Sequence, residues 1–190
     1  NTNDKIRKIS LDLKKENNHL ALFCSYQKKG RGRKNRVWNS SKGDLTCSFL
    51  IKKRLNISQT GKINLFITYS LINILRKIGI KNVQFKWPND IFVEDKKIAG
   101  ILIESSIYNN YINQYIIGIG LNLIKKTMDT NYEYTSLNQL GKKFEPLKLF
   151  FLIVDSMYYY LGNFLRIDFN ILSQNIFKIF YEKIKPIKIN

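Results

Sequence analysis

The chain has 190 residues, 44% of them hydrophobic and 24% charged, with a formal net charge of +18. This length and composition fit one globular domain with its own core, and they argue against a disordered or multidomain chain. The sequence has no run of eighteen apolar residues and its N-terminus is polar, so we expect no membrane span, no signal peptide and a cytoplasmic protein.

The hydrophobic pattern along the chain predicts an α+β fold. Strands are expected at 19–26, 44–52, 82–87, 91–94, 97–106 and 112–123. Helices are expected at 3–16, at about 60–78 and twice in the tail from Pro146. Ser58 and Thr60 are candidate caps for the second helix, and Gly79 is a candidate stop. The first tail helix is expected to bury an apolar stripe formed by Leu147, Phe150, Phe151, Val154, Tyr158, Leu161 and Leu165.

A basic, glycine-containing segment separates the first two predicted strands and reads QKKGRGRKNRVWNS over residues 27–40. Gly30 and Gly32 allow the backbone to approach a ligand closely. The arginines of this segment offer forked donors that suit phosphate or carboxylate, and its tryptophan offers a face on which a base can stack. The alternatives are a disordered basic loop or an RNA-binding arginine–glycine segment.

Two charged clusters, KWPND at 86–90 and KKIAG at 96–100, flank a short predicted strand. A tight turn at 95–96 is expected, and it places Asp90 and Lys97 on neighbouring strands. The proline of the first cluster cannot donate to a central ladder, so it marks the edge of the first strand. A lysine that faces a cleft from a strand suits a phosphate group. The alternative is a surface hairpin whose charges are solvated.

The remaining candidate residues carry weaker signals. Gly118 and Gly120 form an isolated GxG motif, but a strand pattern rather than a helix follows it, so we reject a Rossmann-type nucleotide site. Cys24 and Cys47 lack metal-ligand spacing and are expected to be reduced, buried thiols. His19 is the one histidine of the chain and is expected to be structural.

The spans GRGRKNRVW, KWPND, KKIAGILIE and GIGLN occur in an order that resembles biotin protein ligases, densely over residues 1–123. The resemblance implies a mixed, mostly antiparallel β-sheet with helices packed on one face, as in class II synthetase-like folds. It also implies an enzyme that uses ATP and Mg²⁺ to convert biotin to biotinyl-5′-AMP with release of pyrophosphate. The biotin then passes to a lysine of the biotin carboxyl carrier domain of acetyl-CoA carboxylase.

The resemblance assigns roles to individual residues of this chain. Biotin contacts are implied for Asn1, Thr2, Asn3, Gln27, Gly30, Arg31, Gly32, Arg33, Lys97, Gly100 and Gly118. Adenylate contacts are implied for Trp38, Asn89 and Asn122. The expected catalytic residues are Arg31, Arg33, Lys97 and Asp90. The three cations neutralise the reacting anions, and Asp90 helps to deprotonate the acceptor lysine. No metal ligands are expected from the protein, and Glu104 is expected to be a structural charge at a strand end.

The resemblance also divides the chain into regions. Residues 1–184 are expected to form the catalytic domain, and 185–190 to be the remnant of the start of a C-terminal β domain that is absent. No N-terminal DNA-binding domain, and hence no DNA partner, is expected, and the protein is expected to be a monomer or homodimer. Asn1 stands where the family usually has serine, which leaves the first biotin contact open.

Two other functions stay open. One is a lipoate or octanoyl ligase or transferase of the same superfamily, which would use a related cleft for a different acyl group. The other is a non-catalytic, basic RNA-binding protein, which the net charge of +18 favours. The basic residues are scattered along the chain, however, so most of them are expected to be solvated surface that speeds encounter with an acidic carrier domain.

Overall fold

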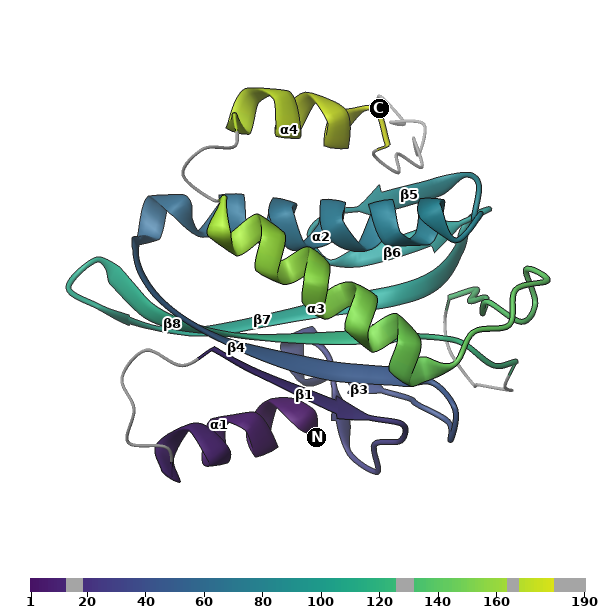
Figure 1. Cartoon of the computed structure of the whole chain (residues 1–190), viewed down its shortest axis with the longest axis horizontal. Coiled ribbons are helices and arrows are strands. Elements are labelled where there is room, and N and C mark those ends of the chain that lie inside the picture. Colours follow the sequence, from purple (N-terminus) through teal and green to yellow (C-terminus); the bar gives the residue numbers. More distant parts are fainter. Residues whose placement is uncertain (13–18, 126–131, 164–167, 180–190) are drawn as a thin grey trace, which may run out of the picture.

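A computed structural model describes residues 1–12, 19–125, 132–163 and 168–179 of the chain (Figure 1). Its helices are α1 (Thr2–Asp12), α2 (Thr60–Lys77), α3 (Pro146–Gly162) and α4 (Phe169–Phe177). Its strands are β1 (Leu20–Cys24), β2 (Gly30–Arg31), β3 (Val37–Trp38), β4 (Leu45–Asn56), β5 (Val83–Lys86), β6 (Asp90–Val93), β7 (Lys96–Tyr108) and β8 (Tyr111–Leu121). Two short 3-10 turns, η1 (Arg33–Asn35) and η2 (Ile57–Gln59), precede β3 and α2.

Six strands form one antiparallel sheet in the order β1-β4-β8-β7-β6-β5. The other two, β2 and β3, pair as a separate two-stranded ribbon. The α+β class and the antiparallel sheet predicted from the sequence are therefore confirmed. The first helix is predicted to reach residue 16 but α1 ends at Asp12, and residues 13–16 lie outside the described residues, as does the 185–190 segment.

The two faces of the sheet are covered differently, as Figure 1 shows. The main core lies between the sheet and helices α2 and α3, and it includes Phe49 and Ile117. Their chain neighbours Leu50 and Ile116 point to the opposite face, where they pack against Ile6 of α1. The prediction of helices on one face thus holds for α2 and α3, whereas α1 lies on the other side. The short α1 leaves part of this second face available for a site.

Helix α2 begins and ends at signals present in the sequence. Before its start, the Asn56 side chain accepts from the Ser58 N–H and the Gln59 side chain accepts from the Asn56 N–H. Neither Ser58 nor Thr60 caps the helix with its side chain, so that prediction is wrong. At the other end, Gly79 has φ of +85°, and its N–H and the next one donate to carbonyls of the last turn. The predicted stop is confirmed.

The hairpin between β6 and β7 turns one residue earlier than predicted. Glu94 and Asp95 have φ of +50° and +63°, as the two central residues of a type I′ turn require. Lys96 is therefore already the first residue of β7. The pairing that follows places Asp90 opposite Gly100, so the start of β6 lies beside the strand that carries the second charged cluster.

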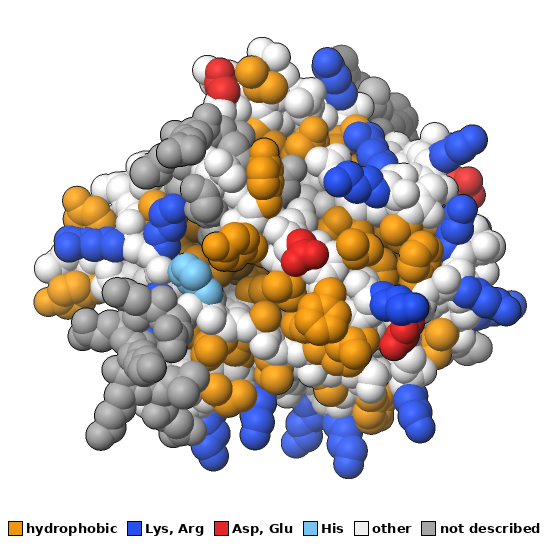
Figure 2. Space-filling view, in the orientation of Figure 1, with side chains coloured by type: hydrophobic (Ala, Val, Ile, Leu, Met, Phe, Trp, Pro, Cys, Tyr) orange, Lys and Arg blue, Asp and Glu red, His pale blue; other side chains and the backbone are white. Residues whose placement is uncertain are grey.

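Helix α3 leaves much of its apolar surface exposed, and Figure 2 shows hydrophobic side chains gathered on this face of the molecule. Its core-facing side chains are Leu149, Phe150, Ile153 and Met157. The predicted buried stripe is largely wrong, because Phe151 and Tyr158 are 56% and 80% exposed. Adjacent aromatic residues at 150 and 151 permit two helical registers, and tertiary packing selects one of them. No helix in the described part of the chain has the length and apolarity needed to cross a membrane.

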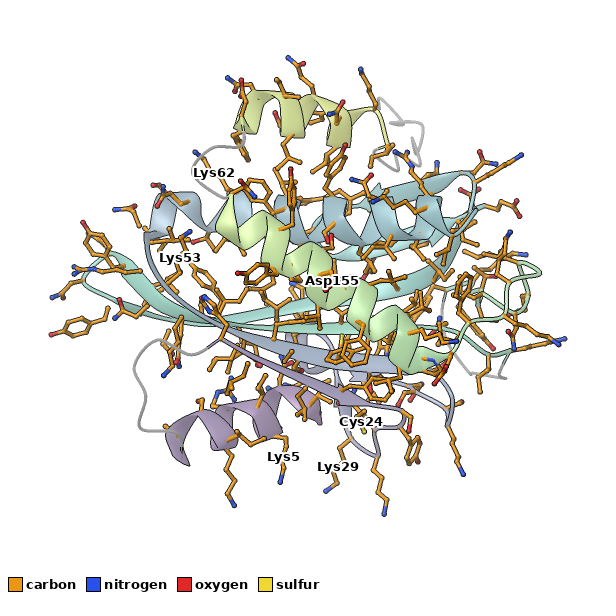
Figure 3. All side chains as sticks on the ribbon, viewed as in Figure 1. Lys5, Cys24, Lys29, Lys53, Lys62 and Asp155 are labelled. Atoms are coloured by element: carbon orange, nitrogen blue, oxygen red, sulfur yellow. The ribbon has the colours of Figure 1, made fainter. Side chains whose placement is uncertain are left out.

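Basic side chains are spread over the molecule, as the scattered pattern in the sequence predicts. Figure 3 shows Lys53 and Lys62 around the junction of β4 and α2, on the side of the helical layer. It also shows Lys5 on α1 and Lys29 near the ribbon, both pointing away from the sheet. The net charge is therefore not confined to one face, which weakens the RNA-binding interpretation, because such binding requires a continuous basic surface.

The two cysteines and the histidine have structural environments. Cys47 is a free, fully buried thiol on β4, and burial raises its pKa well above the usual value. Cys24 is also free but only partly buried, which corrects the prediction that both thiols are buried. His19 accepts a hydrogen bond from the Lys52 N–H at 3.2 Å, in keeping with a structural role.

Candidate functional site

A cavity of about 970 Å³ lies on the sheet face that α1 covers only in part. The first turn of α1, the β2–β3 ribbon and the segment from β5 to the start of β7 line it, together with glycines of β7 and β8. Most residues singled out in the sequence line this cavity, but Gly30 and Asn122 do not. A side chain at Gly30 would overlap the Trp38 carbonyl, so this glycine serves the ribbon pairing. Asn122 is buried and donates to the Thr135 carbonyl at 3.1 Å.

The cavity is strongly basic. Its lining includes the cationic side chains of Arg31, Arg33, Lys34, Arg36, Lys86 and Lys97. Among the described residues that line it, Asp90 alone carries a carboxylate. Cations gathered in a concave site raise the local positive potential and attract anions such as phosphates or carboxylates. Arg36 was singled out only as one of the forked donors of the basic segment. Lys34 and Lys86 were not among the predicted site residues, although the density of basic residues in the two motifs was a signal for them.

Lys97 is held firmly in the cavity wall. Its ammonium lies 2.8 Å from Asp90 Oδ1, which confirms that the hairpin brings these two residues together. Its side chain is only 14% exposed, and its Nζ lies 5.6 Å from the centre of the Trp38 ring and 5.2 Å from that of Tyr132. Both backbone polar groups of Lys97 are hydrogen-bonded. Its N–H donates to the Glu133 carbonyl, and its carbonyl accepts from the Thr135 N–H.

Tyr132 is a cavity residue that the sequence did not reveal. Burial raises the pKa of its hydroxyl, and the negative charge of Asp90 raises it further, against a smaller opposing effect of Arg36. At neutral pH the hydroxyl is therefore protonated and can donate a hydrogen bond. No local sequence pattern indicates that Tyr132 lines the cavity, because this residue reaches the cavity through the parallel bridge between Lys97 and Tyr134.

Trp38 lies on a seat made by two glycines. Gly100 and Gly120 face each other on β7 and β8, and a side chain at either position would overlap the indole ring. For the GxG pair, Gly118 and Gly120, the sequence suggests that the glycines let a ligand lie against the strand. In the structure the Trp38 ring takes that place at Gly100 and Gly120, so the cavity floor there is aromatic.

Replacing Gly120 by alanine should displace the Trp38 ring. The added methyl group overlaps the indole, and an overpacked site of this kind costs ~1–3 kcal/mol of stability. In a Trp87→Phe background, which leaves one of the two tryptophans, we expect a lower Tm and a red shift of Trp38 emission. Gly61→Ala is the matched control, because nothing lies within 4 Å of a methyl group there. Unchanged emission in Gly120→Ala would contradict the packing of the Trp38 ring on Gly120.

The first turn of α1 is tied to the cavity by polar side chains. The Thr2 N–H donates to Gln27 Oε1 at 2.7 Å, and the Gln27 N–H donates to Ser40 Oγ at 3.0 Å. Asn3 accepts from the Ser48 hydroxyl, and its amide covers Gly118, where a side chain would overlap it. Asn3 is 4% exposed, so its side chain is largely committed to contacts within the protein.

Glu104 is not the strand-end charge that was predicted. It lies within β7, and its Oε1 accepts from Arg31 Nη2 at 2.6 Å. Asp4 Oδ1 lies 3.1 Å from the same Arg31 nitrogen, and Arg7 pairs with both carboxylates. Arg31 is therefore ion-paired to α1 through Asp4 and to β7 through Glu104. The next arginine, Arg33, instead donates to Asn89 Oδ1 at 3.3 Å, and both residues line the cavity.

The described residues offer no cluster of protein ligands for a metal ion. No three His, Cys, Asp or Glu side chains are grouped suitably in the described part of the chain. The carboxylate of the cavity, Asp90, is ion-paired to Lys97. A divalent cation would therefore need its oxygen ligands from a bound anion.

Comparisons with known proteins identify the fold. Residues 1–122 match the family model described as the biotin/lipoate A/B protein ligase family. The chain is 32% identical to the bifunctional ligase/repressor BirA of Escherichia coli over 125 residues. The matched region covers 64% of this chain and 39% of that relative. The biotin protein ligase of Aquifex aeolicus in complex with biotin and ATP has a TM-score of 0.69 at 27% identity, covering 84% of this chain and 68% of that one.

The structure of the Leishmania major biotin protein ligase in complex with biotin has a TM-score of 0.79, over 97% of this chain and 79% of that one. At 23% identity, this likeness shows the fold alone. The class II synthetase-like fold implied by the sequence motifs is thereby confirmed. The chain spans about two fifths of the length of BirA, at 39%.

Proposed function

The chain belongs to the biotin/lipoate A/B protein ligase family, and from this premise we propose that it is an ATP-dependent biotin protein ligase. The observation that carries the proposal is the fixed ammonium of Lys97 in a basic cavity, next to the carboxylate of Asp90. The biotin branch is favoured over the lipoate branch by the KWPND motif and by relatives named as biotin ligases in bacteria and plants.

The first half-reaction requires two anions to meet. The biotin carboxylate attacks the α-phosphorus of ATP, the new C–O–P linkage forms, and the bond to the β-phosphate breaks to release pyrophosphate. Lys97 is proposed to neutralise the reacting oxygens, and Arg33 and Arg36, which line the same cavity, are proposed to receive the phosphates. Thr2, in the first turn of α1, and Gln27, which accepts from the Thr2 N–H, are proposed to contact biotin, and Trp38 and Asn89 to contact the adenylate.

The second half-reaction requires a neutral amine. An acceptor lysine has a reference pKa of about 10.4, so it must lose a proton before it attacks the acyl carbon of biotinyl-AMP. Asp90 lines the cavity, is 26% exposed, and is proposed to help remove that proton. An amide bond then forms and AMP leaves. We propose a biotin carboxyl carrier domain as the acceptor, since carrier domains with acidic surfaces would be attracted by the positive charge of this chain.

Mg²⁺ is proposed only as a companion of ATP. The described residues that line the cavity provide a single carboxylate, and it is paired with Lys97, so this described lining offers no set of oxygen ligands for a resident magnesium ion. The cation would be held by the polyphosphate, and none of the roles proposed for protein residues depends on it.

Thermal stabilisation separates the possible functions. A ligand at one hundred times its Kd stabilises a protein by ~2.7 kcal/mol, which shifts Tm by several degrees. Biotin with ATP should give such a shift, with pyrophosphate release and labelling of a carrier domain. Lipoate with ATP giving the larger shift would favour the lipoate branch, and a shift with RNA alone would favour nucleic-acid binding.

A further inference from the structure

We propose that Glu104 is a positioning residue that fixes the β2–β3 ribbon at the edge of the cavity by holding Arg31. Glu104 does not line the cavity, whereas its partners Arg31 and Asn3 do. A residue in this position acts through others and need not touch a ligand.

One carboxylate joins two separate segments of the chain. Its Oε1 accepts from Arg31 of β2 at 2.6 Å, a short distance that is typical of a charge-assisted hydrogen bond. Its Oε2 accepts from Asn3 Nδ2 at 2.9 Å and from Arg7 Nη2 at 3.2 Å, and both of these residues belong to α1. Glu104 therefore ties the ribbon and the first helix to the same point of the sheet.

The ribbon has few other anchors. Each of its strands has two residues, and a two-stranded ribbon of this size is not stable alone. In the described part of the chain, its ion pairs to the rest of the protein are those of Arg31 with Glu104 and Asp4. The Asp4 side chain is 53% exposed and that of Glu104 is 24% exposed, so water screens Glu104 less. Trp38 and the longer bond from Arg33 also attach the ribbon.

Arg31 has a structural role in this geometry. The charge of Arg31 is already balanced by two carboxylates, so Arg31 is suited to keeping the ribbon in place. The position of the ribbon then depends on Glu104. The consequence for catalysis rests on the proposed function: a loosened ribbon should release biotinyl-AMP faster while the chemical step stays nearly unchanged.

The first test needs no ligand and is independent of the proposed function. Amide hydrogen exchange over residues 28–38 is compared among the parental protein, Glu104→Gln and Glu104→Ala. We expect exchange in this segment to rise about tenfold in Glu104→Ala and less in Glu104→Gln, while exchange in α2 stays unchanged. Glu145→Gln, which changes an exposed carboxylate paired with Lys148, is the matched control. Unchanged exchange over 28–38 in both Glu104 variants overturns the proposal.

The second test asks whether Glu104 acts through Arg31. In a double-mutant cycle, Glu104→Ala should add little to the exchange already produced by Arg31→Ala. Biotinyl-AMP should dissociate about tenfold faster from Glu104→Ala, with kcat of adenylation within about threefold of the parental value. Additive effects on exchange, or a loss of kcat without faster dissociation, contradict a positioning role. Absence of any adenylation in the parental protein would instead refute the proposed function and leave the exchange result intact.

Discussion

Lys97→Ala is expected to slow pyrophosphate release from biotin and ATP by ~10²-fold or more while leaving the sheet intact. Asp90 and two aromatic rings hold the ammonium of Lys97, and backbone hydrogen bonds on both sides fix its main chain. Its charge is therefore preorganised where the anions would meet. A preorganised charge needs no rearrangement during the reaction, and its loss therefore falls on the transition state more than on binding.

The neighbouring lysine supplies the control for this experiment. Lys96 carries the same charge one residue earlier, but it is exposed and does not line the cavity. Lys96→Ala should therefore keep nearly parental activity. Because Lys97→Ala leaves Asp90 unpaired, the double variant Lys97→Ala/Asp90→Asn tests whether that uncompensated charge causes the defect. A folded Lys97→Ala variant that releases pyrophosphate near the parental rate would refute the assignment.

The parts of the site that the sequence predicted are the local ones. Asp90 and Lys97 are seven residues apart on one hairpin, so strand pattern and turn chemistry suffice to bring them together. The same holds for the Gly79 stop, where a positive φ requires glycine. The resemblance, carried by short motifs, supplied the family and the fold, and most of the residues to which it assigned a role line one cavity.

The contacts that the sequence did not reveal are between distant segments. Glu104 and Arg31 are 73 residues apart, and no periodicity links an acid within a strand to an arginine of a ribbon. The glycine seat of Trp38 depends likewise on the pairing of β7 with β8. Asn122 lies at the end of a motif, but the chain turns its side chain to Thr135 and away from the cavity. Tertiary packing decides such cases, and residue type alone cannot.

Asp90→Asn is expected to separate the two half-reactions. The substitution keeps the size of the side chain and removes its negative charge, so the proposed proton acceptor is lost while Lys97 remains charged. Transfer from preformed biotinyl-AMP to a carrier domain should slow by ~10²-fold, and adenylation much less. Single-turnover assays with purified biotinyl-AMP measure transfer alone, and pyrophosphate release measures adenylation alone.

Because Asp90 is ion-paired to Lys97, the experiment must distinguish orientation of Lys97 from deprotonation of the acceptor lysine. If Asp90 served only to orient Lys97 at 2.8 Å, its loss would impair adenylation as much as transfer, and raising the pH would not help. If it assists deprotonation of the acceptor, transfer by Asp90→Asn should recover toward the parental rate as the pH approaches the pKa of the acceptor lysine. Asp95→Asn, in the exposed turn of the same hairpin, controls for charge alone. Equal loss of both half-reactions at every pH would assign Asp90 to the positioning of Lys97 and remove it from proton transfer.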